Sequence, residues 1–159
     1  MRPGQALEFE YLADRPQDVP LVIEWWHTVW ADRMGVDISH AEEQLHTSLS
    51  KTDLPIHILA TEAGMPVGTA ALKQQELGEV FPDFQYWLGS VFVTEEARDG
   101  QIASQLSQHI VEIAKLMHLP QLHLQTINLD GGLYTKLGWR PITEFTYKGE
   151  HALLMVKEL

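Results

Sequence analysis

The stretch VTEEARDGQIASQL, residues 93–106, joins an apolar segment to the start of a pattern with helical spacing. A strand that runs directly into a helix leaves the first backbone N–H groups of the helix unpaired. Those N–H groups and the helix dipole together bind anions, so the spacing from Ile102 onward predicts a phosphate site. Gly100 and Ala103 are small enough for an anion to approach, and Arg98 supplies a positive charge. Tight packing of the turn explains the same small residues, and the stretch alone leaves both interpretations open.

The segments on either side of this stretch predict a mixed α and β fold. Alternating or continuous apolar runs predict strands, and apolar residues at three- and four-residue steps predict helices. The expected strands are residues 6–13, 56–61, 66–75, 84–93 and 121–126, with two more between residues 140 and 159. The expected helices run from Leu21 to Met34, which Gly35 ends, from a Ser39 N-cap to Leu49, from Ile102 to Met117, and over residues 131–138. The predicted order is therefore β-α-α-β-β-β-α-β-α-β-β.

Composition limits the chemistry that this chain can carry. None of its 159 residues is a cysteine, which excludes thiol nucleophiles, zinc–thiolate sites, iron–sulfur clusters and disulfides. The eight histidines show no ligand spacing with a carboxylate partner, so we expect no metal. The formal net charge of −11 argues against a nucleic-acid partner, because phosphate binding needs clustered Lys and Arg.

The acidic residues are concentrated in the first part of the chain. Residues 1–64 hold 11 acidic and 4 basic side chains, which favours cation binding there, although solubility explains the excess as well. The N-terminus is charged and broken by prolines, unlike a signal peptide, and no apolar run reaches the roughly 18 residues of a membrane span. We therefore expect one domain over residues 1–159, cytoplasmic, without a membrane partner, and either a monomer or a homodimer.

Residues 98–103, RDGQIA, resemble the acetyl-CoA loop of the GNAT acyltransferase superfamily, which follows a strand and reads Arg/Gln-x-x-Gly-x-Gly/Ala. Gln101 stands where the first glycine is usual, and Gly100 sits one place earlier. The resemblance implies that Arg98 and the backbone N–H groups from Gln101 to Ala103 hold the pyrophosphate of acetyl-CoA. The residues implied for cofactor binding are Val91, Phe92, Val93, Arg98, Asp99, Gly100, Gln101, Ile102, Ala103, Ser104, Asn128 and Tyr134.

A second segment, LHLQTINLDGGLYTKLGWRPI over residues 122–142, is similar to the closing motif of the same superfamily. That motif reads Leu-Tyr-x-Lys-Leu-Gly-Phe, and residues 133–138 match it in register, with Trp139 in place of the phenylalanine. The resemblance implies that Tyr134 donates a proton to the departing thiolate and that Asn128 orients the pantetheine end. A phenol suits this role because its unperturbed pKa of about 10 keeps it protonated at pH 7. The alternative for Tyr134 is an amphipathic core residue whose hydroxyl finds a backbone partner.

The resemblance also implies a fold and a reaction. The fold is a mixed, mostly antiparallel central sheet of about seven strands, flanked by about four helices. The reaction is direct transfer of an acetyl group from acetyl-CoA to an amine, without a covalent enzyme intermediate. In the family, the strand that matches residues 88–93 splays from its neighbour at a bulge and binds pantetheine through its backbone. We place that irregularity at Gly89, although a glycine there also relieves crowding beside Trp87.

The acceptor side is predicted from residue chemistry. An alkylammonium must lose a proton before it attacks, so a carboxylate is expected near it. Glu79 is our candidate, with Asp83 and Glu24 as others, although each of them is also a plausible surface acid. Trp26 and Trp30 lie four residues apart on the first helix. They suit a small cationic amine through cation–π contact, or they pack in the core.

We therefore predict an acetyl-CoA-dependent N-acetyltransferase that acts on a primary amine, with a small cationic amine as the expected small-molecule acceptor. Two alternatives stay open. One is a catalytically silent module that binds acyl-CoA or another ligand on the same fold. The other is an N-acetyltransferase for proteins or peptides, which would need an open groove.

Overall fold

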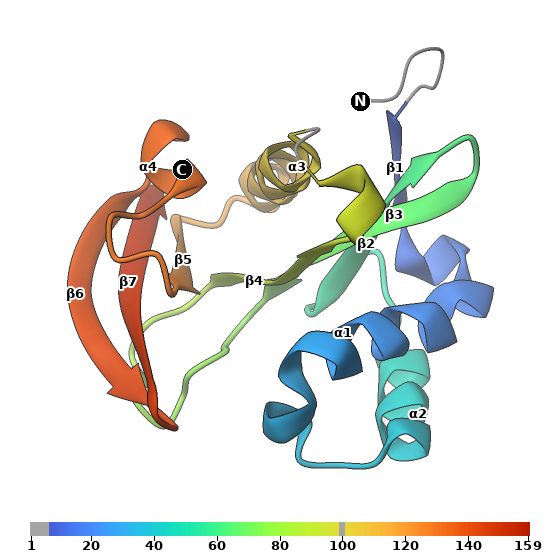
Figure 1. Ribbon diagram of the computed structural model, residues 1–159. Coiled ribbons are helices and arrows are strands. Elements are labelled where there is room, and N and C mark those ends of the chain that lie inside the picture. The colour runs from blue at the N-terminus through green and yellow to red at the C-terminus, as the bar shows by residue number, and fades with distance from the viewer. Residues whose placement is uncertain (1–6, 99–100) are drawn as a thin grey trace.

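The structure is a computed structural model that describes residues 7–98 and 101–159, without the side chains of Asp32 and Arg33. Within these residues, seven strands form one sheet in the order β1-β2-β3-β4-β5-β7-β6 (Figure 1). The strands are β1 (Leu7–Tyr11), β2 (Ile56–Glu62), β3 (Met65–Lys73), β4 (Trp87–Val93), β5 (Gln121–Thr126), β6 (Arg140–Tyr147) and β7 (Glu150–Glu158). The α-helices are α1 (Val19–Met34), α2 (Ile38–Ser48), α3 (Ile102–Leu116) and α4 (Leu133–Lys136). This order confirms the predicted one.

Neighbouring strands are antiparallel except for β4 and β5, which confirms the expected mixed, mostly antiparallel sheet. Strands β4 and β5 run parallel and are in register at one pair, Trp87 opposite His123. Beyond that pair the two strands diverge (Figure 1). The backbone of β4 past Trp87 therefore faces an opening in the sheet.

Strand β4 also carries a bulge on its other edge. Thr69 of β3 lies opposite Phe92, and Ala71 lies opposite Gly89, so β4 has two residues where β3 has one. The additional length falls at Ser90, whose φ of +54° is left-handed. A bulge turns the strand and redirects its side chains, and this one is adjacent to the Gly89 position predicted from the sequence.

The helices cover opposite faces of the sheet (Figure 1). Helix α3 packs on one face, where Leu106 and Ile110 are fully buried together with Leu72 of β3. Helices α1 and α2 cover the other face, where Val22 of α1 and Leu45 of α2 are buried in one hydrophobic cluster. None of the helices in the described ranges is long and apolar enough to cross a membrane.

The ends of α1 and α2 follow local chemistry. Helix α1 ends at Gly35, whose φ of +70° favours glycine, as the sequence predicted. The predicted Ser39 N-cap of α2 is wrong, because the helix begins earlier. Asp37 is the N-cap, and its side chain accepts a hydrogen bond of 2.8 Å from the backbone N–H of His40. An Asp carboxylate caps a helix as well as a Ser hydroxyl does, so spacing could not choose between the two.

Candidate active site

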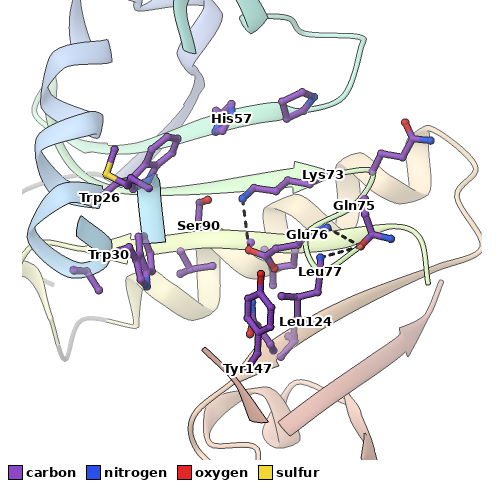
Figure 2. A pocket seen from close by; sticks show the side chains of 18 of the residues that line it. Trp26, Trp30, His57, Lys73, Gln75, Glu76, Leu77, Ser90, Leu124 and Tyr147 are labelled. Atoms are coloured by element: carbon purple, nitrogen blue, oxygen red, sulfur yellow. Dashed lines mark hydrogen bonds and ion pairs between the residues drawn. The ribbon is translucent and has the colours of Figure 1, made fainter. Parts of the chain in front are cut away.

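A cavity of about 1040 Å³ opens on the face of the sheet that α1 and α2 cover (Figure 2). Its lining includes residues 88–91 of β4 and residues 124–126 of β5, on the two sides of the opening between these strands. Tyr134, which α4 supplies, lines the same cavity. Small-molecule sites commonly occupy about 300–1,000 Å³, so the cavity has room for two bound groups that react with each other.

Four of the residues predicted from the sequence meet at this cavity. They are Trp26 and Trp30 of α1, Val91 of β4, and Tyr134. Trp25, the neighbour of Trp26 in α1, stacks on Phe92 with ring centroids 5.2 Å apart and lies in the core. The helix therefore directs two of its three tryptophans toward the cavity.

The Tyr134 phenol is held in its protonated form. Burial raises its pKa, a hydrogen bond with Ser107 of α3 acts in the opposite direction, and the negative charge of Glu76 raises the pKa further. The ring also packs edge-on against Trp139, with centroids 6.2 Å apart. A phenol in this environment is a proton donor at neutral pH rather than a base.

Glu76 is the half-buried carboxylate of the cavity lining, which also includes the exposed Glu150. Glu76 follows β3, its side chain is 18% exposed, and its Oε1 lies 3.5 Å from Nζ of Lys73. A Cβ atom added to Gly89 would lie 2.6 Å from the same oxygen. The absence of a side chain at Gly89 therefore lets the Glu76 carboxylate sit directly against β4, beside the bulge.

Gln75 fixes the loop that carries Glu76. Its side-chain Oε1 accepts hydrogen bonds from the backbone N–H groups of Glu76 and Leu77, at 2.8 and 3.0 Å. Its Nε2 donates to the carbonyl oxygens of Phe81 and Phe84, at 3.2 and 3.1 Å. One amide thus ties both ends of the segment between β3 and β4, and Figure 2 shows its bonds to Glu76 and Leu77.

Glu79, the carboxylate predicted from the sequence, lies elsewhere. It is exposed and accepts a hydrogen bond of 3.3 Å from the Tyr147 hydroxyl, and it does not line the cavity. Asp83 and Glu24 are exposed as well. Sequence reasoning missed Glu76 because its loop has no periodicity. One signal for Glu76 was available, namely that it follows three residues after Lys73, which ends an apolar strand.

The predicted phosphate-binding loop leads into α3. Gln101 is the N-cap residue of this helix, with φ +62° and ψ +21°, and its own side chain makes no capping hydrogen bond. The first N–H groups of the 15-residue helix therefore have no partner within it. Arg98 donates from Nε to the carbonyl oxygen of Val93 at 3.1 Å, and its guanidinium carbon lies 5.9 Å from the Phe92 ring centroid. Asp99 and Gly100 lie outside the described residues.

The remaining predicted cofactor residues surround this helix start and the loop after β5. Ile102 is 3% exposed and packs in the core, whereas Ala103 and Ser104 are half-buried in the first turn. Asn128 is exposed, and its side chain lies against Gly132, where an added Cβ would approach Nδ2 to 3.0 Å. In the part of the chain that the structure describes, no group of three or more His, Asp or Glu could hold a metal ion.

Comparisons with known proteins agree on one family. The sequence matches the model of the acetyltransferase (GNAT) family over residues 19–139. No curated protein sequence matches significantly. Among solved structures, a GNAT-family acetyltransferase from Streptococcus pneumoniae is 19% identical, covers 97% of this chain and 99% of its own, and has a TM-score of 0.71.

Two further solved structures are similar at the same level. A ribosomal-protein-alanine N-acetyltransferase from Brucella melitensis is 19% identical, with 97% of this chain and 99% of that chain covered and a TM-score of 0.71. An aminoglycoside 6'-N-acetyltransferase complexed with coenzyme A is 14% identical, with 96% of each chain covered and a TM-score of 0.71. Identities this low show a shared fold and leave the acceptor open.

Proposed function

We propose, on the premise that this chain belongs to the acetyltransferase (GNAT) family, that it transfers the acetyl group of acetyl-CoA directly to a primary amine of a small molecule. One observation carries the proposal. A single cavity is lined by the Tyr134 phenol and the Glu76 carboxylate, at the opening between β4 and β5. A proton donor and a proton acceptor that face one cavity are the two groups that amide formation from an ammonium requires.

The residues at the helix start fit acetyl-CoA. The first N–H groups of α3, from Gln101 to Ser104, offer directional donors to a pyrophosphate, and the Gln101 side chain does not cap them. Arg98 stands at the end of the preceding 3₁₀ turn and adds positive charge. The backbone of β4 from Val91 to Val93 borders the opening, where pantetheine would pair with it, and Asn128 would orient its end.

Acetyl-CoA, when bound, supplies the activated acetyl group as a thioester. Glu76 receives the proton that the acceptor ammonium must lose, directly or through one water molecule, and so produces the nucleophilic amine. Tyr134 donates its Oη proton to the sulfur as the C–S bond breaks. The nitrogen releases a second proton as the amide forms, and this proton restores the phenol. We assign the role of base to Glu76 in place of Glu79, because only Glu76 lines the cavity.

The aromatic lining supports an amine acceptor. Trp26 and Trp30 both line the cavity, as a cation–π site for a small cationic amine requires. We further propose that residues 1–159 form one acetyltransferase domain. We also propose a cytoplasmic location, because a chain without cysteine suits a reducing compartment.

A thiol-release assay with a panel of amines tests this function. We expect free CoA to appear only when an amine is added, and we expect Tyr134→Phe and Glu76→Gln each to reduce kcat by about 100-fold or more. Glu79→Gln discriminates between the two carboxylates, because it removes the charge of the competing candidate. Binding of acetyl-CoA without release against any amine would favour the silent module. A larger loss in Glu79→Gln than in Glu76→Gln would contradict our assignment of the base.

A further inference from the structure

One end of the cavity presents two buried polar atoms that have no hydrogen-bond partner among the described residues. They are the indole Nε1 of Trp26 and the Nδ1 of His57. Both side chains line the cavity, and their ring centroids lie 5.5 Å apart (Figure 2). His57 is only 5% exposed. Since folded proteins pair nearly all buried polar groups, two such atoms that share a cavity wall indicate a bound partner.

The two residues come from distant parts of the chain. Trp26 lies in the middle of α1, whereas His57 is the second residue of β2 and pairs with Ala71 of β3. Lys73, two residues further along β3, extends over the same cavity toward Glu76 (Figure 2). The wall is therefore assembled by the fold from a helix and two strands.

The chemistry of these groups restricts what they bind. An indole N–H only donates, so the atom opposite Trp26 must be an acceptor. His57 carries no charge at neutral pH, because burial and the nearby Lys73 lower its pKa to about 3. The positive charge at this wall therefore comes from Lys73. A second ammonium group of a diamine would find no acceptor on Trp26 and would be repelled by Lys73.

A carboxylate suits both groups, because it accepts a hydrogen bond from the indole N–H of Trp26 and is attracted by the ammonium of Lys73. Glu76 lies 3.5 Å from Lys73, so negative and positive groups stand side by side in the cavity. An acceptor with an ammonium and a carboxylate on the same carbon atom would place each charge against its opposite. A simple cationic amine would leave the buried indole N–H of Trp26 unpaired.

We propose that the acceptor is an amine that carries a carboxylate, of the amino-acid type, and that Trp26, His57 and Lys73 bind this carboxylate while Glu76 receives the ammonium. The proposal rests on the proposed acetyltransferase function and narrows its substrate class. Trp26, His57 and Lys73 are thus specificity-determining residues, whereas the proton transfers stay with Glu76 and Tyr134. We thus replace the small cationic amine expected from the sequence by a zwitterionic acceptor.

Matched acceptor pairs test the proposal by kinetics. Each pair consists of an amino acid and the amine that lacks its carboxylate, such as L-leucine with 3-methylbutylamine, L-phenylalanine with 2-phenylethylamine, and L-lysine with 1,5-diaminopentane. The amino-acid amide completes each set, because it replaces the carboxylate by an uncharged polar group and keeps the amine. We expect kcat/KM to be at least about tenfold higher for the carboxylate member of the preferred pair.

Variants show which residues produce that preference. Trp26→Phe keeps an aromatic ring but removes the N–H, and should raise KM for the carboxylate member about tenfold more than it raises KM for the partner amine. Lys73→Met should abolish the preference for carboxylate over amide. Trp25→Phe is the matched control, because it removes a neighbouring indole that does not line the cavity, and should leave the ratio within each pair unchanged.

Binding of the products provides a readout that does not need turnover. An N-acetyl amino acid should bind at least about tenfold more tightly than the matching N-acetyl amine in calorimetric titration, and Trp26→Phe should remove the difference. Equal binding, equal losses for both members in Trp26→Phe, or preferred acetylation of diamines would overturn the carboxylate site and leave the acetyltransferase intact. Tighter binding of the carboxylate form without turnover of any amine would instead refute the catalytic function alone.

Discussion

Replacing Gly89 by alanine isolates the role of the Glu76 carboxylate without touching its chemistry. The new methyl group would lie 2.6 Å from Oε1, whereas ordinary contacts begin near 3.4 Å, so the carboxylate must withdraw by about 0.8 Å. A displacement of about 1 Å in a catalytic group commonly reduces the rate about 100-fold. We therefore expect kcat for Gly89→Ala to fall by about 10- to 100-fold.

The fold should tolerate this substitution. The φ of Gly89 is not in the left-handed region, and the displaced atoms are the end of a flexible side chain. We expect the free energy of unfolding to change by less than about 1 kcal/mol, because alanine reduces the entropy of the unfolded chain while the side chain shifts. Initial rates of thiol release at saturating acetyl-CoA and urea denaturation measure the two quantities on the same preparation.

A double-mutant cycle with Glu76→Gln completes the test. If Gly89→Ala acts through the carboxylate, it should lower kcat by less than about twofold in the Glu76→Gln background. A wild-type kcat for Gly89→Ala, or an equal loss of kcat in both backgrounds, would contradict an effect through the Glu76 carboxylate. The second result would mean that the methyl group disturbs the backbone of β4 and not the base.

Three further predictions follow from buried or strained groups. Gln75→Leu breaks the four hydrogen bonds of one amide, so urea denaturation should show a loss of about 2–3 kcal/mol, with kcat reduced because Glu76 is no longer held. The pKa of His57 is lowered to about 3 in the folded state, so the unfolded chain binds the proton first as the pH falls below about 6.5. Wild-type protein should therefore lose about 2 kcal/mol more stability than His57→Gln between pH 7 and pH 5 in denaturation curves, and equal losses would contradict a neutral buried ring. Gln101 has a φ of +62°, so Gln101→Gly should be about 1 kcal/mol more stable than Gln101→Ala in thermal unfolding, and the reverse order would exclude the left-handed conformation.

The sequence predicted the order of elements because the signals for those elements are local. The spacing of apolar residues identifies each helix and strand separately, and Gly35 marks the end of α1 by its own conformational freedom. The two motifs that resemble the GNAT family are contiguous, so residues 98–103 and 133–138 could be matched without knowledge of the fold.

The acceptor side could not be predicted in the same way. Glu76 and Glu79 are three residues apart in one aperiodic loop, and composition does not distinguish them. The structure distinguishes them by contacts within this loop and with β4, since Gln75 ties the two ends of the loop together and Gly89 makes room for one carboxylate.

The carboxylate site depends even more on tertiary structure. Trp26 and His57 are separated by a helix end, a second helix and a loop, and their lack of partners becomes visible only when both are buried against the same cavity. No spacing in the sequence relates the two residues. The sequence predicted that Trp26 and Trp30 bind the amine substrate through their ring faces. The structure adds that the indole N–H of Trp26 is buried without a partner among the described residues.

The most direct test of the central claim is a calorimetric titration with acetyl-CoA, followed on the same sample by thiol release against amines and amino acids. Direct transfer predicts saturable binding, no free CoA until an acceptor is added, and release that Tyr134→Phe slows about 100-fold or more without weakening acetyl-CoA binding. Failure to bind acetyl-CoA, or release of CoA at the same rate with and without an acceptor, would contradict direct transfer in this cavity.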